Sequence, residues 1–513
     1  MMDVLRHTGR GMLTEFIGPS VSNLTMDCTQ WRVAAYTDQE LMEMVTNRPP
    51  GADQELVDLA MQDLESYVAG INAYIDEVSA DSSRLPAEYP ALQQTPDEWT
   101  ISDTVAVASL IGGNLGVGGG NEIGNALFLN ELEAEGFSPT DARTILEDLR
   151  LVDDPEAPSS TSDPFPYDVD LGPVDTDSVA RPDDAPVPSD DTDGDSCGAD
   201  GGFPLKGELP TSVDGPFGPI PLIEMDRGAS NALLVDRRLS ANGVPAAVFG
   251  PQVAYWSPEI LMELDMHGPG LQARGVGFPG ISLYVLLGRG DGYGYSATSA
   301  SGDQVDTRAV ELCEPGGGTA TIDSDGYIAP GGACEEFDLV EDDWIAKPTA
   351  GSCPTPNPLD PGCQIQNISM VTERAQLSGL PGSVGLRGGN WGLVQSRGEV
   401  DGTPVAFVRQ RVTYGGEVDS SLAYVEMMDP DRINGPEDFQ RAFARFNFTF
   451  NWFYVDGRHI AFQLGGMHPV RAPNTDPDLP VWEAPEFAWQ RALTFEETPK
   501  DIDPEKGYIT SWN

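Results

Sequence analysis

The amino-terminal part of the chain has a helical pattern of apolar positions. Between residues 52 and 78, apolar side chains recur every three to five residues, at Leu56, Leu59, Leu64, Val68, Ile71 and Ile75. This spacing places them on one face of an amphipathic helix packed on a core. Further helices are expected from about Ser102, a suitable N-cap residue, through Leu110, and from Glu122 to Leu132.

A different pattern begins at Ser230. The runs Asn231–Val235 and Val244–Phe249 are short and apolar, and Asn242-Gly243 lies between them. An Asn-Gly pair is typical of a turn between two antiparallel strands. We therefore expect two paired strands, with Ser230 at the entrance of the first and Gly250-Pro251-Gln252 at the end of the second.

Between these two parts the composition changes sharply. From residue 153 to 200 the chain consists mainly of Asp, Pro, Ser and Gly, and Arg181 is its one basic residue. Such a segment has too few apolar side chains to form a core. Aspartates alternate at 191, 193 and 195 as in a calcium loop, but Gly202 stands where that loop needs a bidentate Glu. We interpret the segment as an acidic tether.

The charge balance narrows the class of partner. The 513 residues include 82 acidic and 29 basic side chains, for a formal net charge of -53. A nucleic-acid partner is not expected, because phosphate binding needs clustered Lys and Arg. Salt adaptation and metal affinity both remain open as reasons for the acidity. The four histidines form no zinc motif, and no apolar run is long enough to span a bilayer.

Six cysteines indicate disulfide chemistry. Four of them fall in a Gly- and Pro-rich segment, at Cys313, Cys334, Cys353 and Cys363. Four cysteines allow three pairings, of which we choose the sequential one, and reduced thiols remain the alternative in a cytosolic protein. Cys28 and Cys197 are either free or paired.

Several short motifs occur in a characteristic order along nearly the whole chain. They are Thr95–Thr100, Gly120–Leu127, Ser230 with its apolar strand, Gly250-Pro251-Gln252, His267–Gly270, Val276–Ile281, Ser299–Asp306, Tyr454–Gly457, His468–Pro480 and Gly507–Asn513. Each motif alone is weakly specific, but the ordered set resembles the penicillin G acylase family of N-terminal nucleophile hydrolases.

The resemblance implies an α+β fold, an incomplete four-layer αββα sandwich. Residues 1–155 would form the helical region of a small subunit (alpha chain), and 156–229 a spacer removed on maturation. Residues 230–513 would form the catalytic region of a large subunit (beta chain), with a Cys-rich insertion at 313–363. We therefore expect an alpha/beta heterodimer from one precursor, periplasmic or secreted. Relatives extend beyond both ends of this sequence, so we expect a fragment truncated at both ends.

The resemblance also assigns catalytic roles. Cleavage of the Ala229-Ser230 bond would free an α-amine whose reference pKa of about 7.7 to 8.0 suits a base near neutral pH. The Ser230 hydroxyl would then attack an amide carbonyl and form an acyl-enzyme. Oxyanion donors would be the backbone amide of Ser299, with Thr298 as a one-position alternative, and the side-chain amide of Asn513. Gln252 would orient the nucleophile and contact substrate.

The expected substrate is a small-molecule amide that joins a hydrophobic acyl group to a small amine. Val253 and Leu287 stand at acyl-pocket positions where relatives commonly carry aromatic residues. Smaller walls favour a longer or branched aliphatic acyl group over phenylacetyl. Gln252 favours the penicillin acylase branch over the acyl-homoserine lactone acylases, which tend to carry His there. A long-chain N-acyl-homoserine lactone acylase remains the alternative enzyme.

One structural calcium ion is the implied cofactor. Glu122, Asp303 and Asp306 supply hard oxygen ligands at positions similar to those of the family's calcium site, and the Val305 carbonyl completes one side. The ion would join the two subunits and take no part in acyl transfer. A non-catalytic, acidic, calcium-binding secreted protein of the same fold remains the alternative outside the enzymes.

Overall fold

The computed structural model describes residues 1–47, 52–150, 161, 172–189, 197, 212–215, 218–221, 230–253, 259–353, 355, 357, 360–379 and 390–512. The amino-terminal part is helical, as predicted. Its helices are α1 (Met2–Gly9), α2 (Leu13–Ile17), α3 (Val21–Ala34), α4 (Asp38–Thr46), α5 (Gln54–Ala80), α6 (Glu88–Leu92), α7 (Ile101–Leu115), α8 (Glu122–Ala134) and α9 (Pro139–Arg150). No described helix combines the length and the apolar character needed to cross a membrane.

The three helices expected from the sequence are present as α5, α7 and α8. In α5, Leu56 and Leu64 are buried, but Leu59 is 36% exposed, so its place on the buried face was wrong. The spacing explains this result: Leu59 follows Leu56 by three residues and precedes Leu64 by five, which turns it away from the buried stripe.

The predicted cap of α7 was also displaced. Thr100, and not Ser102, is the N-cap: its side chain accepts a hydrogen bond from the Asp103 N–H, and the Asp103 carboxylate accepts one from the Thr100 N–H. This reciprocal pair satisfies two amide groups at the helix start. Ser102 lies inside the first turn and donates to the Asp38 carbonyl oxygen.

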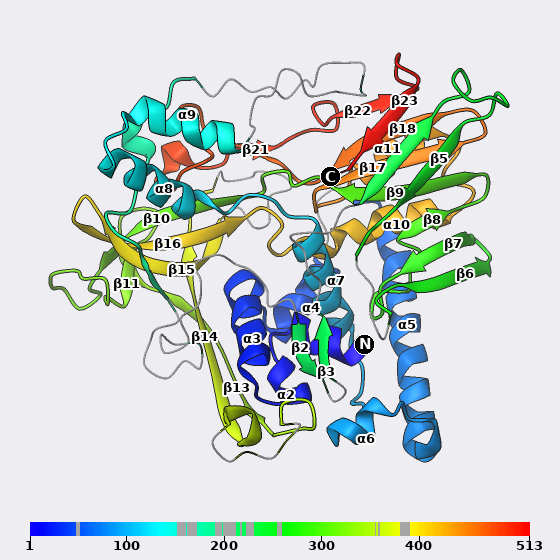
Figure 1. Cartoon of the computed structure of the whole chain (residues 1–513), viewed down its shortest axis with the longest axis horizontal. Coiled ribbons are helices and arrows are strands. Elements are labelled where there is room, and N and C mark those ends of the chain that lie inside the picture. Colours follow the sequence, from blue (N-terminus) through cyan, green and yellow to red (C-terminus); the bar gives the residue numbers. More distant parts are fainter. Residues whose placement is uncertain are drawn as a thin grey trace.

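A seven-stranded antiparallel sheet forms the centre of the carboxy-terminal part (Figure 1). Its order is β22 (Lys500–Ile502), β18 (Ile460–Gly465), β17 (Phe450–Asp456), β9 (Tyr293–Ser299), β8 (Leu287–Arg289), β7 (Leu271–Gly277) and β6 (Met262–Gly268). Helices α10 (Ser421–Met428) and α11 (Pro436–Phe443) pack on one face through Trp452 and Tyr454.

The other face of this sheet meets a three-stranded sheet. Its order is β23 (Tyr508–Ser511), β4 (Asn231–Val235) and β5 (Ala246–Gly250). Phe453 and Phe462 pack there against Leu234 and Ile509. Neighbouring residues of a strand point to opposite faces of its sheet. Trp452 therefore packs against the helices, and Phe453 packs against the three-stranded sheet. Helices, the seven-stranded sheet and the three-stranded sheet thus form three successive layers. The predicted pairing of the two strands after Ser230 is confirmed.

A second large sheet has nine strands. Its main path is β12 (Cys334–Glu336), β11 (Gly326–Ile328), β10 (Val305–Cys313), β16 (Thr403–Arg411), β15 (Trp391–Val400), β14 (Gln366–Gln376) and β13 (Asp338–Ala346); β1 (Val187–Pro188) pairs with β15, and β20 (Val481–Trp482) with β10. In Figure 1 this sheet lies on the opposite side of α7 from the other two sheets. The remaining strands of the described residues form two small antiparallel pairs, β2 (Ser212–Gly215) with β3 (Gly218–Pro221), and β19 (Pro469–Val470) with β21 (Arg491–Ala492).

All six cysteines are paired. Cys313 bonds to Cys334 and Cys353 to Cys363, which confirms the sequential pairing. The third disulfide joins Cys28 of α3 to Cys197, 169 residues later in the chain. The sequence left that pair undecided because nothing local relates the two positions.

Candidate functional site

Ser230 lies at the head of the middle strand of the three-stranded sheet. β4 pairs on one side with β5, where Asn231 faces Gly250, and on the other with β23, where Ala232 faces Ser511. Extending the register of β4 and β5 by one residue places Ser230 opposite Pro251. Two neighbouring strands therefore fix the position of this residue.

An apolar cavity of about 170 Å³ has Ser230 in its wall. Four further residues singled out from the sequence line the same cavity, namely Val253, Leu287, Thr298 and Ser299. Gln252 does not line it, and its side chain is exposed. Asn513 lies outside the described residues, as do the acidic residues from 191 to 195 and the Ala229 side of the expected cleavage site.

One face of α7 forms a long wall of this cavity. The lining residues of the helix are spaced by one turn, at Thr104, Val105, Ala108, Ile111, Gly112 and Leu115. The Ser299 hydroxyl donates a hydrogen bond of 2.8 Å to the Leu115 carbonyl oxygen, so the Ser299 end of the cavity lies at the carboxyl end of α7. With a rise of about 1.5 Å per residue, the wall from Leu115 back to Thr104 is about 16 Å long.

Aromatic side chains form a second wall, which sequence reasoning missed. They are Phe278, Tyr284, Tyr424, Phe446, Phe448, Phe450 and Trp452. The signal was present, because aromatic residues occupy every second position from 446 to 452. That alternation is typical of side chains on one face of an extended segment. The walls at Val253 and Leu287 are aliphatic, but the cavity as a whole is rich in aromatic side chains.

Among the described residues that line the cavity, one side chain is charged. Glu417 is only 1% exposed, and it forms a buried ion pair with Arg411 and accepts a hydrogen bond from the Ser109 hydroxyl. A buried carboxylate without such partners would carry a large desolvation cost. The negative charge of Glu417 is therefore neutralised by Arg411, which does not line the cavity. The interior of the cavity remains predominantly apolar.

Residues 298 and 299 are held from two sides. Asn451 donates from its side-chain amide to the Thr298 hydroxyl oxygen at 3.2 Å and to the Ser299 carbonyl oxygen at 3.1 Å. The hydroxyls of Thr298 and Ser511 are 3.0 Å apart, which links β9 to β23. Residues 298 and 299 are thus held within the seven-stranded sheet, and the Thr298 hydroxyl ties them to the three-stranded sheet that contains β4.

A cluster of three carboxylates lies where α8 meets β10. Glu122, Asp303 and Asp306 each present an oxygen within 4.8 Å of the others, so the group could hold a metal ion. Both Glu122 oxygens accept hydrogen bonds, one from the Gly120 N–H at 2.9 Å and one from the Thr307 hydroxyl at 2.8 Å. Burial, together with the negative charge of Asp306, raises the pKa of Glu122.

Arg471 reaches into this cluster. Its guanidinium donates to Asp303 at 2.6 Å and to Asp306 at 2.7 Å, and the Trp489 indole N–H donates to Asp306 at 2.6 Å. Burial raises the pKa of Asp303 to about 7, against the opposing effect of Arg471. Burial acts in the same direction on Asp306, but the cations Arg471 and Arg308 outweigh it and hold the Asp306 pKa below its usual value.

The backbone of Gly119 packs closely against the cluster and leaves no room for a side chain. A Cβ atom on Gly119 would lie 1.9 Å from Oδ1 of Asp303 and 2.9 Å from the Val305 carbonyl oxygen. Both oxygens lie around this one position, so the Asp303 carboxylate and the Val305 carbonyl are close neighbours. Gly119 also has a φ of +86°, which favours glycine. Three carboxylates and one carbonyl are oxygen donors of the kind that calcium prefers, so the donor set fits this ion.

Comparisons with known proteins identify the family of this chain. The penicillin amidase family profile matches residues 1–513, and the chain belongs to this family. Among curated proteins, penicillin G acylase of Escherichia coli is 22% identical over 465 residues, covering 88% of this chain and 49% of that protein. The chain thus spans about half the length of this curated relative.

Among solved structures, a thermostable penicillin G acylase from Alcaligenes faecalis matches 55% of this chain and 44% of its own chain. The sequence identity is 20% and the TM-score is 0.43.

Proposed function

We propose that this protein is a self-processing amidohydrolase that cleaves a linear amide through a Ser230 acyl-enzyme. The observation that carries the proposal is the position of Ser230, at the head of a central strand and in the wall of a long apolar cavity. Family membership supports the same chemistry. A nucleophile whose reacting atom borders a water-excluding pocket is the arrangement that acyl transfer needs.

Cleavage before Ser230 would supply the base. The new α-amine, with a reference pKa of about 7.7 to 8.0, accepts the hydroxyl proton and later passes it to the leaving amine. We assign the oxyanion donors to the Ser299 backbone amide and the Asn513 side chain. The fixed backbone at residues 298 and 299 supports the first assignment. For the second, the register of β23 and β4 directs the chain beyond Ser511 toward Ser230.

We place Gln252 on the amine side of the substrate. It follows Pro251 at the end of β5, close to Ser230 in the register of the strands, but its exposed side chain lies outside the acyl cavity. From there its amide can orient the nucleophile or contact the small amine, while Val253 and Leu287 contact the acyl group.

The cavity favours a long hydrophobic acyl group. Its wall along α7 is about 16 Å long, and an aliphatic chain advances by less than one C–C bond length, about 1.5 Å, per carbon. On the order of ten carbons therefore fit in an extended chain. A total volume of about 170 Å³ spread over this length is narrow, which suits a linear chain. The same length supports a long-chain N-acyl-homoserine lactone as the second candidate substrate.

We extend the proposal to the complete fold, the cellular compartment and the subunit composition. The three observed layers are consistent with part of a four-layer αββα sandwich. Three disulfides suit an oxidising compartment, which supports a periplasmic or secreted protein. Cleavage before Ser230 would yield the alpha/beta heterodimer.

We assign one structural calcium ion to Glu122, Asp303, Asp306 and the Val305 carbonyl. When bound, the ion would supply positive charge that joins α8 of the small-subunit region to β10 of the large-subunit region. Arg471 already neutralises part of the cluster through ion pairs within the large-subunit region. The hydrogen bond from the Thr307 hydroxyl to Glu122 links the two regions directly. The cluster is separate from Ser230 and takes no part in the proposed acyl transfer.

The decisive experiment uses protein expressed from its complete reading frame, beside the variant Ser230→Ala. We expect the unmodified protein to split, with a new amino terminus at Ser230, and the variant to remain whole, as measured by intact mass and amino-terminal sequencing. Chromogenic phenylacetyl, octanoyl and dodecanoyl amides then rank the acyl groups, and dodecanoyl-homoserine lactone tests the second candidate. An uncut protein that binds calcium and hydrolyses none of them would instead support the non-catalytic alternative.

A further inference from the structure

Part of the acidic segment between the two subunit regions is built into the folded body. The backbone of residues 172–189 forms a series of hydrogen bonds with distant parts of the chain. Their amides donate to carbonyl oxygens at 2.8 to 2.9 Å, in the pairs Asp175 to Asn474, Ala180 to Pro480 and Asp183 to Glu399. Ala180 is 0% exposed and packs with Val400, Val405 and Phe407. This stretch is therefore bonded to the folded body, and its Ala180 is part of the core.

Charged side chains of the same stretch reinforce this attachment. The Asp183 carboxylate accepts hydrogen bonds of 2.9 Å from the backbone N–H groups of Asp401 and Gly402, at the turn between β15 and β16. Arg181 donates at 2.9 Å to Glu133, and also to Asn130, both in α8. The stretch thus joins a helix of the small-subunit region to a sheet of the large-subunit region.

The attachment continues along β15, beyond the residues of β15 that pair with β14. In β1, Val187 faces Arg397 and Pro188 faces Ser396 of β15. Ser189 then donates to β15 twice, from its N–H to the Gln395 carbonyl oxygen at 3.1 Å and from its hydroxyl to the Val394 carbonyl oxygen at 3.0 Å.

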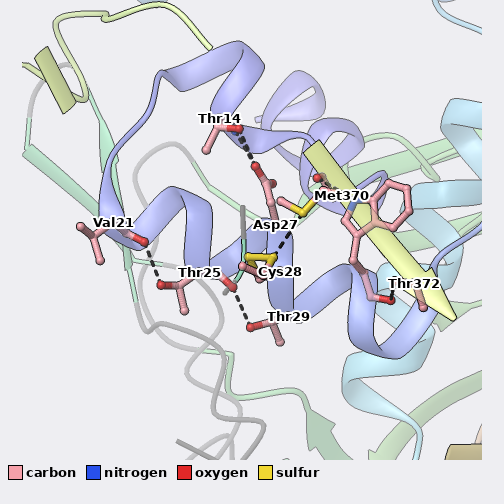
Figure 2. Close-up of a disulfide and its surroundings, with 11 residues drawn as sticks. Thr14, Val21, Thr25, Asp27, Cys28, Thr29, Met370 and Thr372 are labelled. Atoms are coloured by element: carbon pink, nitrogen blue, oxygen red, sulfur yellow. Dashed lines mark hydrogen bonds between the residues drawn. A yellow bond between two sulfur atoms is a disulfide. The ribbon is translucent and has the colours of Figure 1, made fainter. Parts of the chain in front are cut away.

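The last anchor is covalent. Cys197 forms a disulfide with Cys28 of α3 and is only 3% exposed, in a cluster with Trp31, Trp344 and Met370 (Figure 2). Its sulfur lies 3.2 Å from the Met370 sulfur, on β14. Hydrolysis of a peptide bond elsewhere in the segment leaves this disulfide intact, so residue 197 stays bound to α3 after any cut that lies beyond it.

We propose that residues 172–197 are a permanent strap of the mature protein, and that maturation removes only residues between Cys197 and Ser230. This inference rests on the proposed cleavage before Ser230, and it replaces the boundary near residue 155 expected for the spacer. The strap bonds to α8, caps the turn between β15 and β16, adds a strand to the sheet and ends on α3. Its loss would expose the apolar side chains that pack around Ala180 and around Cys197, and would remove the link from α8 to β15.

The test is the mass of the chains in the cleaved, purified protein, before and after reduction. We expect a small-subunit chain that includes residues 172–197. If a bond before residue 172 is also cut, a separate piece carrying these residues should appear only after reduction. A non-reducing tryptic digest should link the Cys28 peptide, Gly11–Arg32, to the peptide that carries Cys197. Cleaved protein that lacks residues 172–197, or that has a free Cys28 thiol, would overturn the proposal.

Limited trypsin digestion tests the strap independently of the proposed hydrolase function. A chain that never splits before Ser230 contradicts the self-processing hydrolase, but brief trypsin treatment of that folded chain still tests the strap. Residues 172–197 should stay bound to the α3 peptide until reductant is added; their early release contradicts the strap. In the double variant Cys28→Ser, Cys197→Ser, trypsin should remove the region around residue 197 faster than in the unmodified protein. In the matched double variant Cys353→Ser, Cys363→Ser, trypsin should remove this region at the same rate as in the unmodified protein.

Discussion

The Ser299 hydroxyl donates a hydrogen bond of 2.8 Å to the Leu115 carbonyl oxygen. This bond joins β9 to the last turn of α7, and so joins the part of the chain after Ser230 to the part before it. A carbonyl at the end of a helix lacks a partner within the helix, so a hydroxyl from the sheet satisfies it. The bond therefore sets the distance between the proposed oxyanion region and the wall of the acyl cavity.

The first prediction concerns this wall. Ala108 lies near the middle of the lining face of α7, so Ala108→Leu should close the part of the cavity beyond it. Overpacking by added methyl groups costs about 1 to 3 kcal/mol. We expect kcat/KM for a dodecanoyl amide to fall by about 10- to 100-fold, and for a butanoyl amide to change little, in steady-state assays of the two substrates.

The control for Ala108→Leu is Ala73→Leu, which makes the same change at an exposed position of α5. It should leave both rates unchanged. An equal loss for short and long acyl groups in Ala108→Leu would contradict the proposed course of the cavity along α7.

A second prediction concerns pH and His468. Burial lowers the pKa of His468 to about 4, from an ordinary value of 6.5, so the ring is neutral in the folded protein. The unfolded chain takes up a proton near pH 6.5 and the folded chain only near pH 4. His468 therefore destabilises the fold progressively as the pH falls from about 6.5 to about 4, by about 3 kcal/mol at the lower limit.

The measurement for His468 is the difference between two pH profiles of unfolding free energy, because the many carboxylates titrate in both proteins. The variant His468→Gln should lose less stability than the unmodified protein between pH 6.5 and pH 4. The exposed His267 provides the control, and His267→Gln should not reduce the acid-induced loss. If the unfolding free energy falls equally steeply with pH in His468→Gln and in the unmodified protein, the proposed effect of His468 is refuted.

A third prediction compares two disulfides in the intact chain. The Cys28–Cys197 bond closes a separation of 169 residues, and the Cys353–Cys363 bond one of 10 residues. In the chain-entropy description, removing the first costs about 5 kcal/mol and removing the second about 3 kcal/mol. Paired Cys→Ser variants should therefore differ in denaturation midpoint by urea titration, with the Cys28 and Cys197 pair less stable. The reverse order would show that the folded-state surroundings of each bond outweigh loop length.

A fourth prediction concerns the acidic cluster. Removing the cation in Arg471→Gln leaves Asp303 and Asp306 buried without their main partner, which typically costs about 3 to 5 kcal/mol. We expect a lower melting temperature in the presence of chelator, and a larger rise on addition of calcium than in the unmodified protein. Differential scanning calorimetry with and without calcium measures both effects.

The control for this experiment is Arg491→Gln, which breaks an exposed ion pair with Glu497. Exposed pairs contribute about 0 to 1 kcal/mol, so little change is expected. The double variant Glu122→Gln, Asp303→Asn should abolish the calcium-dependent rise. A rise that persists in this double variant would place the calcium site elsewhere.

The sequence was most informative where structure depends on neighbours along the chain. The helix from residue 54 and the strand pair after Ser230 follow from local spacing, and both are present. Features that need distant partners were not accessible. Arg471 is 165 residues from Asp306, and Cys28 is 169 residues from Cys197, so no local pattern relates them. The aromatic alternation from 446 to 452 was visible, but its place in the cavity was not.

The strands on either side of Ser230 also govern how the chain responds to cleavage. β4 has a hydrogen-bonded neighbour on each side, so the five residues from Asn231 to Val235 keep their ladder when the preceding peptide bond is broken. A freed chain end at the edge of a sheet would fray and sample many directions. Under the proposed cleavage before Ser230, the new chain end would lead directly into a strand that is hydrogen-bonded on both sides. It would therefore need almost no conformational search to lie in the cavity wall.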